Sequence, residues 1–233
     1  MDSLHIVHSV GKATVAKSRP GEPCRTIEPV PDSPIKIVLF DLGGVLFDPG
    51  GVLPMRDLAR LDNDDELWRR WLTCRWVRDF ERGYCSSVEF AQGVVDDWAL
   101  DISPDDFLAA FESWPRGPYP GASVLVDLVR ESVPVACLSN TNVLHWESHF
   151  KKFLAILELD FTFLSFELGM VKPDREIFEE VSSRLPVSRD KVLFLDDNTL
   201  NVEAATASGL TARRTQGVAE AQHALTVAGV LPS

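Results

Sequence analysis

The stretch Ile35-Lys36-Ile37-Val38-Leu39-Phe40-Asp41-Leu42-Gly43-Gly44 decides the fold of this 233-residue chain. A short apolar run that ends in an acid and two glycines is typical of a buried parallel strand followed by a turn. Similar apolar runs follow at 133–138, 161–164 and 192–195. Helical patterns lie near 121–131, 143–154, 174–185 and 199–208. Strands that alternate with helices predict an α/β fold, with a parallel sheet covered by helices on both faces.

Residues 54–118 interrupt this alternation with a run of helical patterns. Trp68, Trp71 and Trp76 recur at helical spacing, and Ser103-Pro104 is typical of a helix start. We expect an all-helical insertion, or cap, here. Its tryptophans either pack the cap's own helices or face a ligand. The predicted division is a flexible leader at 1–34, a core at 35–53 and 119–233, and the cap at 54–118.

Composition limits the possible partners and locations. The formal net charge is −12, and no basic stripe offsets it, so we expect no nucleic-acid partner. The apolar runs are shorter than the roughly 20 residues of a membrane span, so we expect no membrane insertion. The cysteines, at positions 24, 74, 85 and 137, form no CxxC pair and favour a cytoplasmic location. A mitochondrial presequence in the leader is the alternative.

Chemically reactive side chains stand at or near the ends of the apolar runs. They are Asp41, Ser139 with Asn140, Lys172, and the pair Asp196-Asp197. Ligands of parallel α/β sheets bind beyond the carboxyl ends of the strands, so we expect these residues to converge. Carboxylates at two strand ends suit Mg²⁺, while a serine hydroxyl, backbone N–H groups and a lysine suit phosphate oxygens. A carboxylate in line with phosphorus can form an aspartyl-phosphate.

This ordered set resembles the haloacid dehalogenase (HAD) superfamily, in the branch with a helical cap after the first motif. The resemblance covers about residues 35–215 and is strongest to the sugar-phosphate phosphatases whose first motif reads Asp-Leu-Gly. The phosphatase domain of soluble epoxide hydrolase is a more distant relative. The resemblance implies a Rossmann-like core with an inserted all-helical cap. Phe80-Glu81-Arg82-Gly83, followed by Glu89-Phe90, is also similar to the caps of these phosphatases.

The resemblance assigns a role to each motif residue. Asp41 matches the nucleophile, which also binds the metal, and Ser139 matches the phosphate-binding residue. Lys172, within Leu168-Gly169-Met170-Val171-Lys172-Pro173, matches the lysine of the third motif. Asp197 is expected to ligate Mg²⁺ directly, with Asp196 in the outer shell. Asn201 stands where the family often has another polar residue that supports the metal site.

Gly43 departs from the family pattern. Phosphatases of the superfamily usually carry an aspartate there, which protonates the leaving group and then deprotonates water. The Gly43 carbonyl can still ligate Mg²⁺, but an acid–base group is worth roughly 10²- to 10⁴-fold in rate. Three interpretations follow: a leaving group that needs little protonation, a substitute such as Asp48 or His145, or binding of phosphorylated ligands without turnover.

The prediction is a Mg²⁺-dependent phosphatase of a small organic phosphate, either a sugar phosphate, another monoester or a diphosphate. Asp41, Lys172 and Asp48 are its expected catalytic residues, and Ser139, Asn140, Lys172 and His145 its expected substrate-binding residues. The expected metal ligands are Asp41, Gly43, Asp197 and Asp196. The rival predictions are a silent phosphate-binding protein and a 2-haloacid dehalogenase. The oligomeric state is left open.

Overall fold

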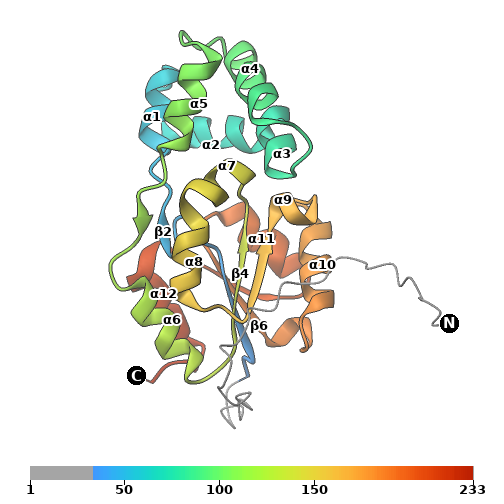
Figure 1. The fold of residues 1–233 in the computed structure, drawn as a ribbon. Coiled ribbons are helices and arrows are strands. Elements are labelled where there is room, and N and C mark those ends of the chain that lie inside the picture. The colour runs from blue at the N-terminus through green and yellow to red at the C-terminus, as the bar shows by residue number, and fades with distance from the viewer. Residues whose placement is uncertain (1–33, 233) are drawn as a thin grey trace, which may run out of the picture.

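The computed structural model describes residues 34–232 of the chain (Figure 1). The leader predicted at 1–34 and Cys24 therefore lie outside the described residues, apart from Pro34. Within 34–232, no helix is both long enough and apolar enough to cross a membrane.

Five parallel strands form the central sheet in the order β5-β4-β1-β6-β7. Their bounds are β1 Ile37–Phe40, β4 Val135–Ser139, β5 Phe161–Leu164, β6 Val192–Asp196 and β7 Thr211–Arg214. The register places Phe40 opposite Cys137 on β4 and Leu195 on β6. The four strands predicted from apolar runs are confirmed, whereas β7 was not predicted. The expected α/β class with a parallel sheet is confirmed.

Helices cover both faces of the sheet, which explains the continuous apolar runs. Val38 and Phe40 point to one face, under α6 (Ala122–Arg130), α8 (Lys151–Leu157) and α12 (Gly217–Val227). Ile37 and Leu39 point to the other face, under α10 (Arg175–Arg184) and α11 (Thr199–Ala207). Because β1 is buried on both faces, it needs apolar residues at every position. Its carboxyl end, and with it Asp41, is fixed rigidly in the core.

Five further helices form a separate layer above the carboxyl ends of the strands (Figure 1). They are α1 Val52–Leu58, α2 Asp64–Thr73, α3 Arg75–Glu81, α4 Ser87–Trp98 and α5 Pro104–Glu112. Ser103 caps α5 by accepting a hydrogen bond from the Asp106 N–H, as the sequence predicts. This inserted helical cap has its own aromatic core, in which Phe80 stacks on Phe90 with ring centroids 4.4 Å apart. The cap is connected to the sheet domain through an antiparallel pair of short strands, β2 (Phe47–Asp48) and β3 (Gly117–Pro118).

Polar contacts join the cap to the core in two places. Arg78 on α3 and Arg82, the C-cap residue of that helix, both pair with Asp174 just before α10, at 2.7 and 2.6 Å. On the other side, α5 meets the segment formed by α7 (Val143–His145) and the π-helical turn η1 (Trp146–Phe150). There His149 Nε2 donates to the Glu112 carbonyl at 2.7 Å. These contacts hold α3 and α5 over the strand ends.

Candidate active site

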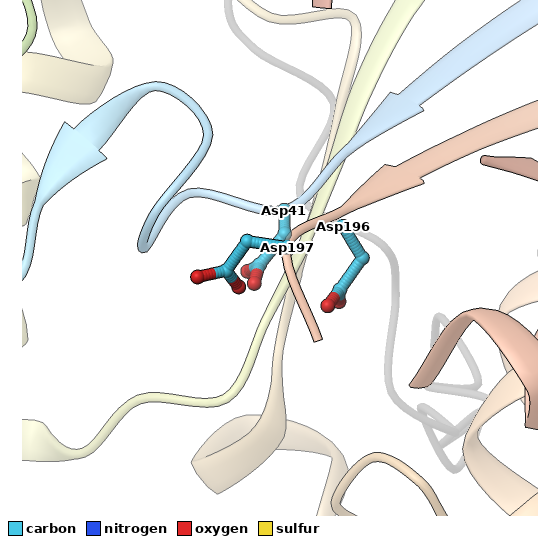
Figure 2. Close-up of side chains that lie close together, drawn as sticks. All are labelled: Asp41, Asp196 and Asp197. Atoms are coloured by element: carbon cyan, nitrogen blue, oxygen red, sulfur yellow. The ribbon is translucent and has the colours of Figure 1, made fainter. Parts of the chain in front are cut away.

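Three aspartates meet at the carboxyl ends of β1 and β6. Asp41 follows β1 directly, while Asp196 is the last residue of β6 and Asp197 comes next. Because β1 and β6 are neighbours in register, one carboxylate oxygen of each residue lies within 4.8 Å of the others. Figure 2 shows the three side chains grouped at this edge of the sheet. The sequence prediction that these acids converge agrees with this geometry.

Lys172 lies buried between two of these carboxylates. Its Nζ lies 2.6 Å from Asp196 Oδ2 and 3.0 Å from Asp41 Oδ1, and it also donates to the Leu138 carbonyl at 3.2 Å. Burial alone would lower the pKa of Lys172, but the adjacent Asp196 and Asp41 carboxylates raise it above its usual value. The ammonium therefore stays charged, and it offsets part of the negative charge of the cluster.

The donor set fits a divalent cation bound by oxygen ligands. Burial raises the pKa of Asp41 well above its usual value and that of Asp197 to about 6, because carboxylates crowd together away from water. Asn201 donates to both oxygens of Asp196 at 3.0 Å. The buried Oδ1 of Asn201 accepts no hydrogen bond from any residue in 34–232. The cluster holds three carboxylates but only one ammonium, so its net charge is negative and attracts a cation. The carboxylate oxygens and the unpartnered amide oxygen are the kind of ligand that Mg²⁺ prefers.

Two glycines shape the loop after Asp41. Gly44 has φ +74°, and a Cβ there would lie 2.1 Å from Asp197 Oδ2. Only glycine allows this conformation together with so close an approach. Gly43 is different, since a Cβ there would meet only Pro49 Cβ, at 4.0 Å. Position 43 thus has room for a Cβ without a close contact.

The predicted phosphate-binding residues lie on the neighbouring strand β4. Ser139 is buried at the end of β4, beside β1. The Asn140 side chain donates to the Lys172 carbonyl and accepts from the Lys172 N–H, both at 2.9 Å. This amide therefore links the end of β4 to the Lys172 loop. Because its side-chain amide is engaged in this way, Asn140 would contact a ligand through its backbone.

A cavity of about 590 Å³ extends from these residues into the cap. Asp41, Ser139, Lys172 and Asp197 line its polar end. Its walls toward the cap are mainly apolar and aromatic: Met55, Leu67, Trp68, Trp71, Leu72, Phe111 and Trp114. The tryptophans thus divide between the two predicted roles. Trp98 packs in the cap core and Trp76 covers Gly93, whereas Trp68 lines the cavity, and Trp71 and Trp114 both line the cavity and pack in the cap core.

His145 lines the cavity, but both of its ring nitrogens are engaged. Nε2 donates to the Phe111 carbonyl at 2.7 Å, and Nδ1 lies 3.4 Å from the Asn142 amide nitrogen. Burial lowers the pKa of His145 to about 4, so the ring is neutral at pH 7. Its ring also stacks on Phe111, with centroids 4.1 Å apart. These contacts show that His145 connects the core to the cap.

Asp48 does not line this cavity. Its Oδ1 accepts from the Gly50 N–H at 2.9 Å, and its Oδ2 pairs with Arg116 at 3.3 Å. The geometry thus places Asp48 in the β2–β3 connection, outside the residues that line the cavity. Its predicted catalytic role finds no support in this arrangement.

Glu81 is a cavity-lining acid to which the sequence analysis gave no role. It is the last residue of α3, on the cap side of the cavity. Burial raises its pKa to about 7, against the opposing effect of the Lys172 charge. The only sequence signal was its place in Phe80-Glu81-Arg82-Gly83, at the end of a helix. Its position over the core depends on tertiary structure.

The chain is similar to known hydrolases in sequence and in fold. The family model for haloacid dehalogenase-like hydrolases matches residues 35–209. The chain is 28% identical over 186 residues to the sesquiterpene phosphatase astK of Aspergillus oryzae, covering 75% of this chain and 87% of that protein. It is also 28% identical over 210 residues to a D-ribitol-5-phosphate phosphatase of Bacteroides thetaiotaomicron, covering 83% and 98%. A HAD family enzyme from Bacteroides thetaiotaomicron, solved with magnesium and inorganic phosphate, superposes with a TM-score of 0.59 at 25% identity, covering 78% and 94%.

Proposed function

This chain belongs to the haloacid dehalogenase-like hydrolases, and we propose that it is a Mg²⁺-dependent phosphatase acting through an aspartyl-phosphate on Asp41. The observation that carries the proposal is the Asp41–Lys172–Asp197 cluster at the polar end of the cavity. The phosphatase names of its relatives and the magnesium–phosphate complex of a structural neighbour support it. The proposal includes the division into a core at 35–53 and 119–233 and a cap at 54–118, which closes over the site.

Asp41 is prepared to act as a nucleophile. Its Oδ1 accepts from the Leu42 N–H at 2.7 Å and pairs with Lys172. Its Oδ2 accepts no hydrogen bond from any described residue, and this oxygen attacks phosphorus in line. The Lys172 ammonium and the Ser139 hydroxyl stabilise the developing charge on the phosphoryl oxygens. Water then attacks the phosphorus of the aspartyl-phosphate, which releases inorganic phosphate and restores the carboxylate.

Mg²⁺ would be held by Asp41, Asp197 and the Gly43 carbonyl, with Asp196 in support. Bound there, it would neutralise the charge of the phosphate and of the carboxylates. The ion pair between Asp196 and Lys172 holds the Lys172 ammonium in place without a contribution from the cation. The same pair sets the distance between Lys172 and Asp41.

The substrate proposed here is a phosphate ester with an apolar organic body. The aromatic and aliphatic walls of the cavity would bury such a body, at about 25 cal/mol per Å² of apolar surface removed from water. Among the described residues of the cap-side walls, the side chains with charged or hydroxyl groups for a sugar are Arg69, Thr73 and Glu81, and they are outnumbered by the apolar and aromatic ones. The relative named as a sesquiterpene phosphatase acts on a compound of the apolar kind, which supports this choice.

The test is phosphate release from a panel of esters, with and without Mg²⁺. The panel contains a sesquiterpenyl monophosphate and diphosphate, an alkyl phosphate, ribitol 5-phosphate and a hexose 1-phosphate, with Asp41→Asn as the inactive control. We expect release that needs both Mg²⁺ and Asp41, with the apolar esters preferred by at least tenfold in kcat/KM. Thermal stabilisation by Mg²⁺ and phosphate without release would instead indicate a binding protein. Chloride release from a 2-chloroacid without Mg²⁺ would indicate a dehalogenase.

A further inference from the structure

The phosphatase reaction needs a proton donor that the core of this chain does not supply. An alkoxide leaves slowly unless it is protonated as the ester bond breaks. Gly43 has no side chain, and neither substitute considered from the sequence is available. Asp48 lies outside the cavity, bound to Arg116, and His145 commits its Nε2–H to the Phe111 carbonyl.

One carboxyl group remains in the cavity outside the metal cluster. Among residues 34–232, the acids that line the cavity are Asp41, Glu81 and Asp197. Asp41 and Asp197 belong to the cation site. Glu81 approaches from the opposite side, on the last turn of α3, and no described residue forms a hydrogen bond or ion pair with its carboxyl. A half-buried, unpartnered carboxyl that faces a phosphate site is free to exchange a proton with substrate or water.

The charges around Glu81 keep this carboxyl able to both give and take a proton. Burial raises its pKa to about 7, while the positive charges of Lys172, Arg78 and Arg82 act in the opposite direction. Asp174 engages both arginines across the interface between cap and core. The elements packed against α3 add charged residues of their own, among them Arg69 on α2, Glu89 on α4 and Glu167 on α9 (Ser165–Leu168).

We propose that Glu81, carried by the cap, is the catalytic acid and base of this site and replaces the aspartate that is missing at position 43. This inference rests on the proposed phosphatase function. In the first step Asp41 Oδ2 bonds to phosphorus, the ester P–O bond breaks, and protonated Glu81 gives its proton to the departing oxygen. In the second step the Glu81 carboxylate takes a proton from the attacking water, whose oxygen bonds to phosphorus. The P–O bond to Asp41 breaks, and Glu81 is protonated again.

The double ion pair to Asp174 positions this acid. Arg78 lies on the same helix as Glu81, three residues before it, and Arg82 is the C-cap residue directly after it, so Asp174 fixes the end of α3 over the core. The geometry of the proton transfer therefore depends on cap closure. An open cap would take Glu81 away from the leaving group.

The test compares Glu81→Gln with wild type on two monoesters with different leaving groups. An alkyl phosphate needs a proton donor, whereas p-nitrophenyl phosphate does not, because p-nitrophenolate is stable as an anion. For the variant we expect a loss of 10²- to 10⁴-fold in kcat on the alkyl phosphate. On p-nitrophenyl phosphate we expect a burst of one equivalent of p-nitrophenolate at the wild-type rate, followed by slow turnover. Glu89→Gln, at an exposed position of the same cap, is the matched control and should retain wild-type rates on both esters.

A second variant separates chemistry from structure. At position 43 a Cβ would meet only Pro49 Cβ, at 4.0 Å, and Gly43→Asp should restore alkyl phosphate turnover in the Glu81→Gln background by at least tenfold. The pH–rate profile of the wild type should show a group titrating near pH 7 that is absent from Glu81→Gln. A purely structural role for Glu81 would give neither the rescue nor this change in profile.

The results of these assays distinguish a failure of the Glu81 proposal from a failure of the phosphatase proposal. If the wild type hydrolyses the alkyl phosphate and Glu81→Gln does so at a similar rate, the role of Glu81 is overturned and the phosphatase stands. If Glu81→Gln loses the burst together with turnover, and Gly43→Asp restores neither, Glu81 is a structural residue and the inference is again overturned. If the wild type hydrolyses neither ester nor any other ester of the panel, the phosphatase proposal itself fails.

Discussion

Replacing Lys172 with methionine should destabilise the protein strongly in the absence of metal. The side chain is 1% exposed, and its ammonium lies 2.6 Å from Asp196 and 3.0 Å from Asp41. At an effective dielectric constant of about 20, each attraction is worth about 5.5–6.5 kcal/mol. Removing the ammonium also removes its own desolvation cost of several kcal/mol, so the expected net loss is about 3–5 kcal/mol. Methionine keeps the length of the chain, so the loss reports on charge rather than on a cavity.

The assay is urea unfolding, followed by tryptophan fluorescence at pH 7.5 in EDTA. Lys151→Met is the matched control, because Lys151 pairs with Glu147 on an exposed helix face, at 2.9 Å. Such a pair contributes about 0.3–0.5 kcal/mol. Added Mg²⁺ should stabilise Lys172→Met more than wild type, since the cation replaces the lost positive charge. A loss below about 1 kcal/mol, or one no larger than that of Lys151→Met, would refute the idea that Lys172 holds the carboxylates together.

Three further perturbations test the glycine turn, the connection between core and cap at His145, and the cavity wall. Gly44→Ala should lower the free energy of unfolding by about 1–2 kcal/mol and weaken Mg²⁺ binding in calorimetry, because the new Cβ would displace Asp197. Gly43→Ala should change neither quantity. In wild type, the free energy of unfolding should fall by about 2 kcal/mol between pH 7.5 and 5 through His145 alone, because the unfolded imidazole binds a proton near pH 6.5 and the folded one only near pH 4. His145→Gln should lose that part of the acid dependence, and an unchanged slope would contradict the neutral ring. Trp71→Ala should lower kcat/KM about tenfold for an apolar phosphate ester and less than twofold for ribitol 5-phosphate; equal losses would argue against an apolar substrate body.

The core and the acid cluster could be predicted because their signals are local in sequence. A strand buried on both faces needs a continuous apolar run, and β1 shows one. Parallel strands place their carboxyl ends at one edge, so Asp41 and Asp197 had to converge once the topology was known. By contrast, β7 (Thr211–Arg214) lies at the edge of the sheet and carries two exposed arginines, so it has no apolar run. The strands β2 and β3 have two residues each, too few for any periodicity.

The cap side of the site could not be predicted from local patterns. Which tryptophans face the cavity depends on how α2 and α5 are oriented relative to each other. The spacing of the tryptophans in the sequence does not determine this orientation. The prediction for Asp48 rested on its distance in sequence from Asp41, whereas the β2–β3 pairing directs its carboxylate to Gly50 and Arg116. Glu81 lies forty positions from Asp41, at the end of α3 in the helical layer above the strand ends. Only the fold brings the two residues to one cavity.

The two-strand connection between cap and core has an evolutionary consequence. Because the chain enters and leaves the cap through the paired strands β2 and β3, exchange for another cap would not require a change in the order of the sheet strands. In a phosphatase whose acid lies in the core, such an exchange would change substrate choice and leave the chemistry intact. With Glu81 as the acid, this cap carries both recognition and the proton, so a chimera with a foreign cap would lose turnover unless position 43 became aspartate. Divergence of this lineage would then be limited to changes within its own cap.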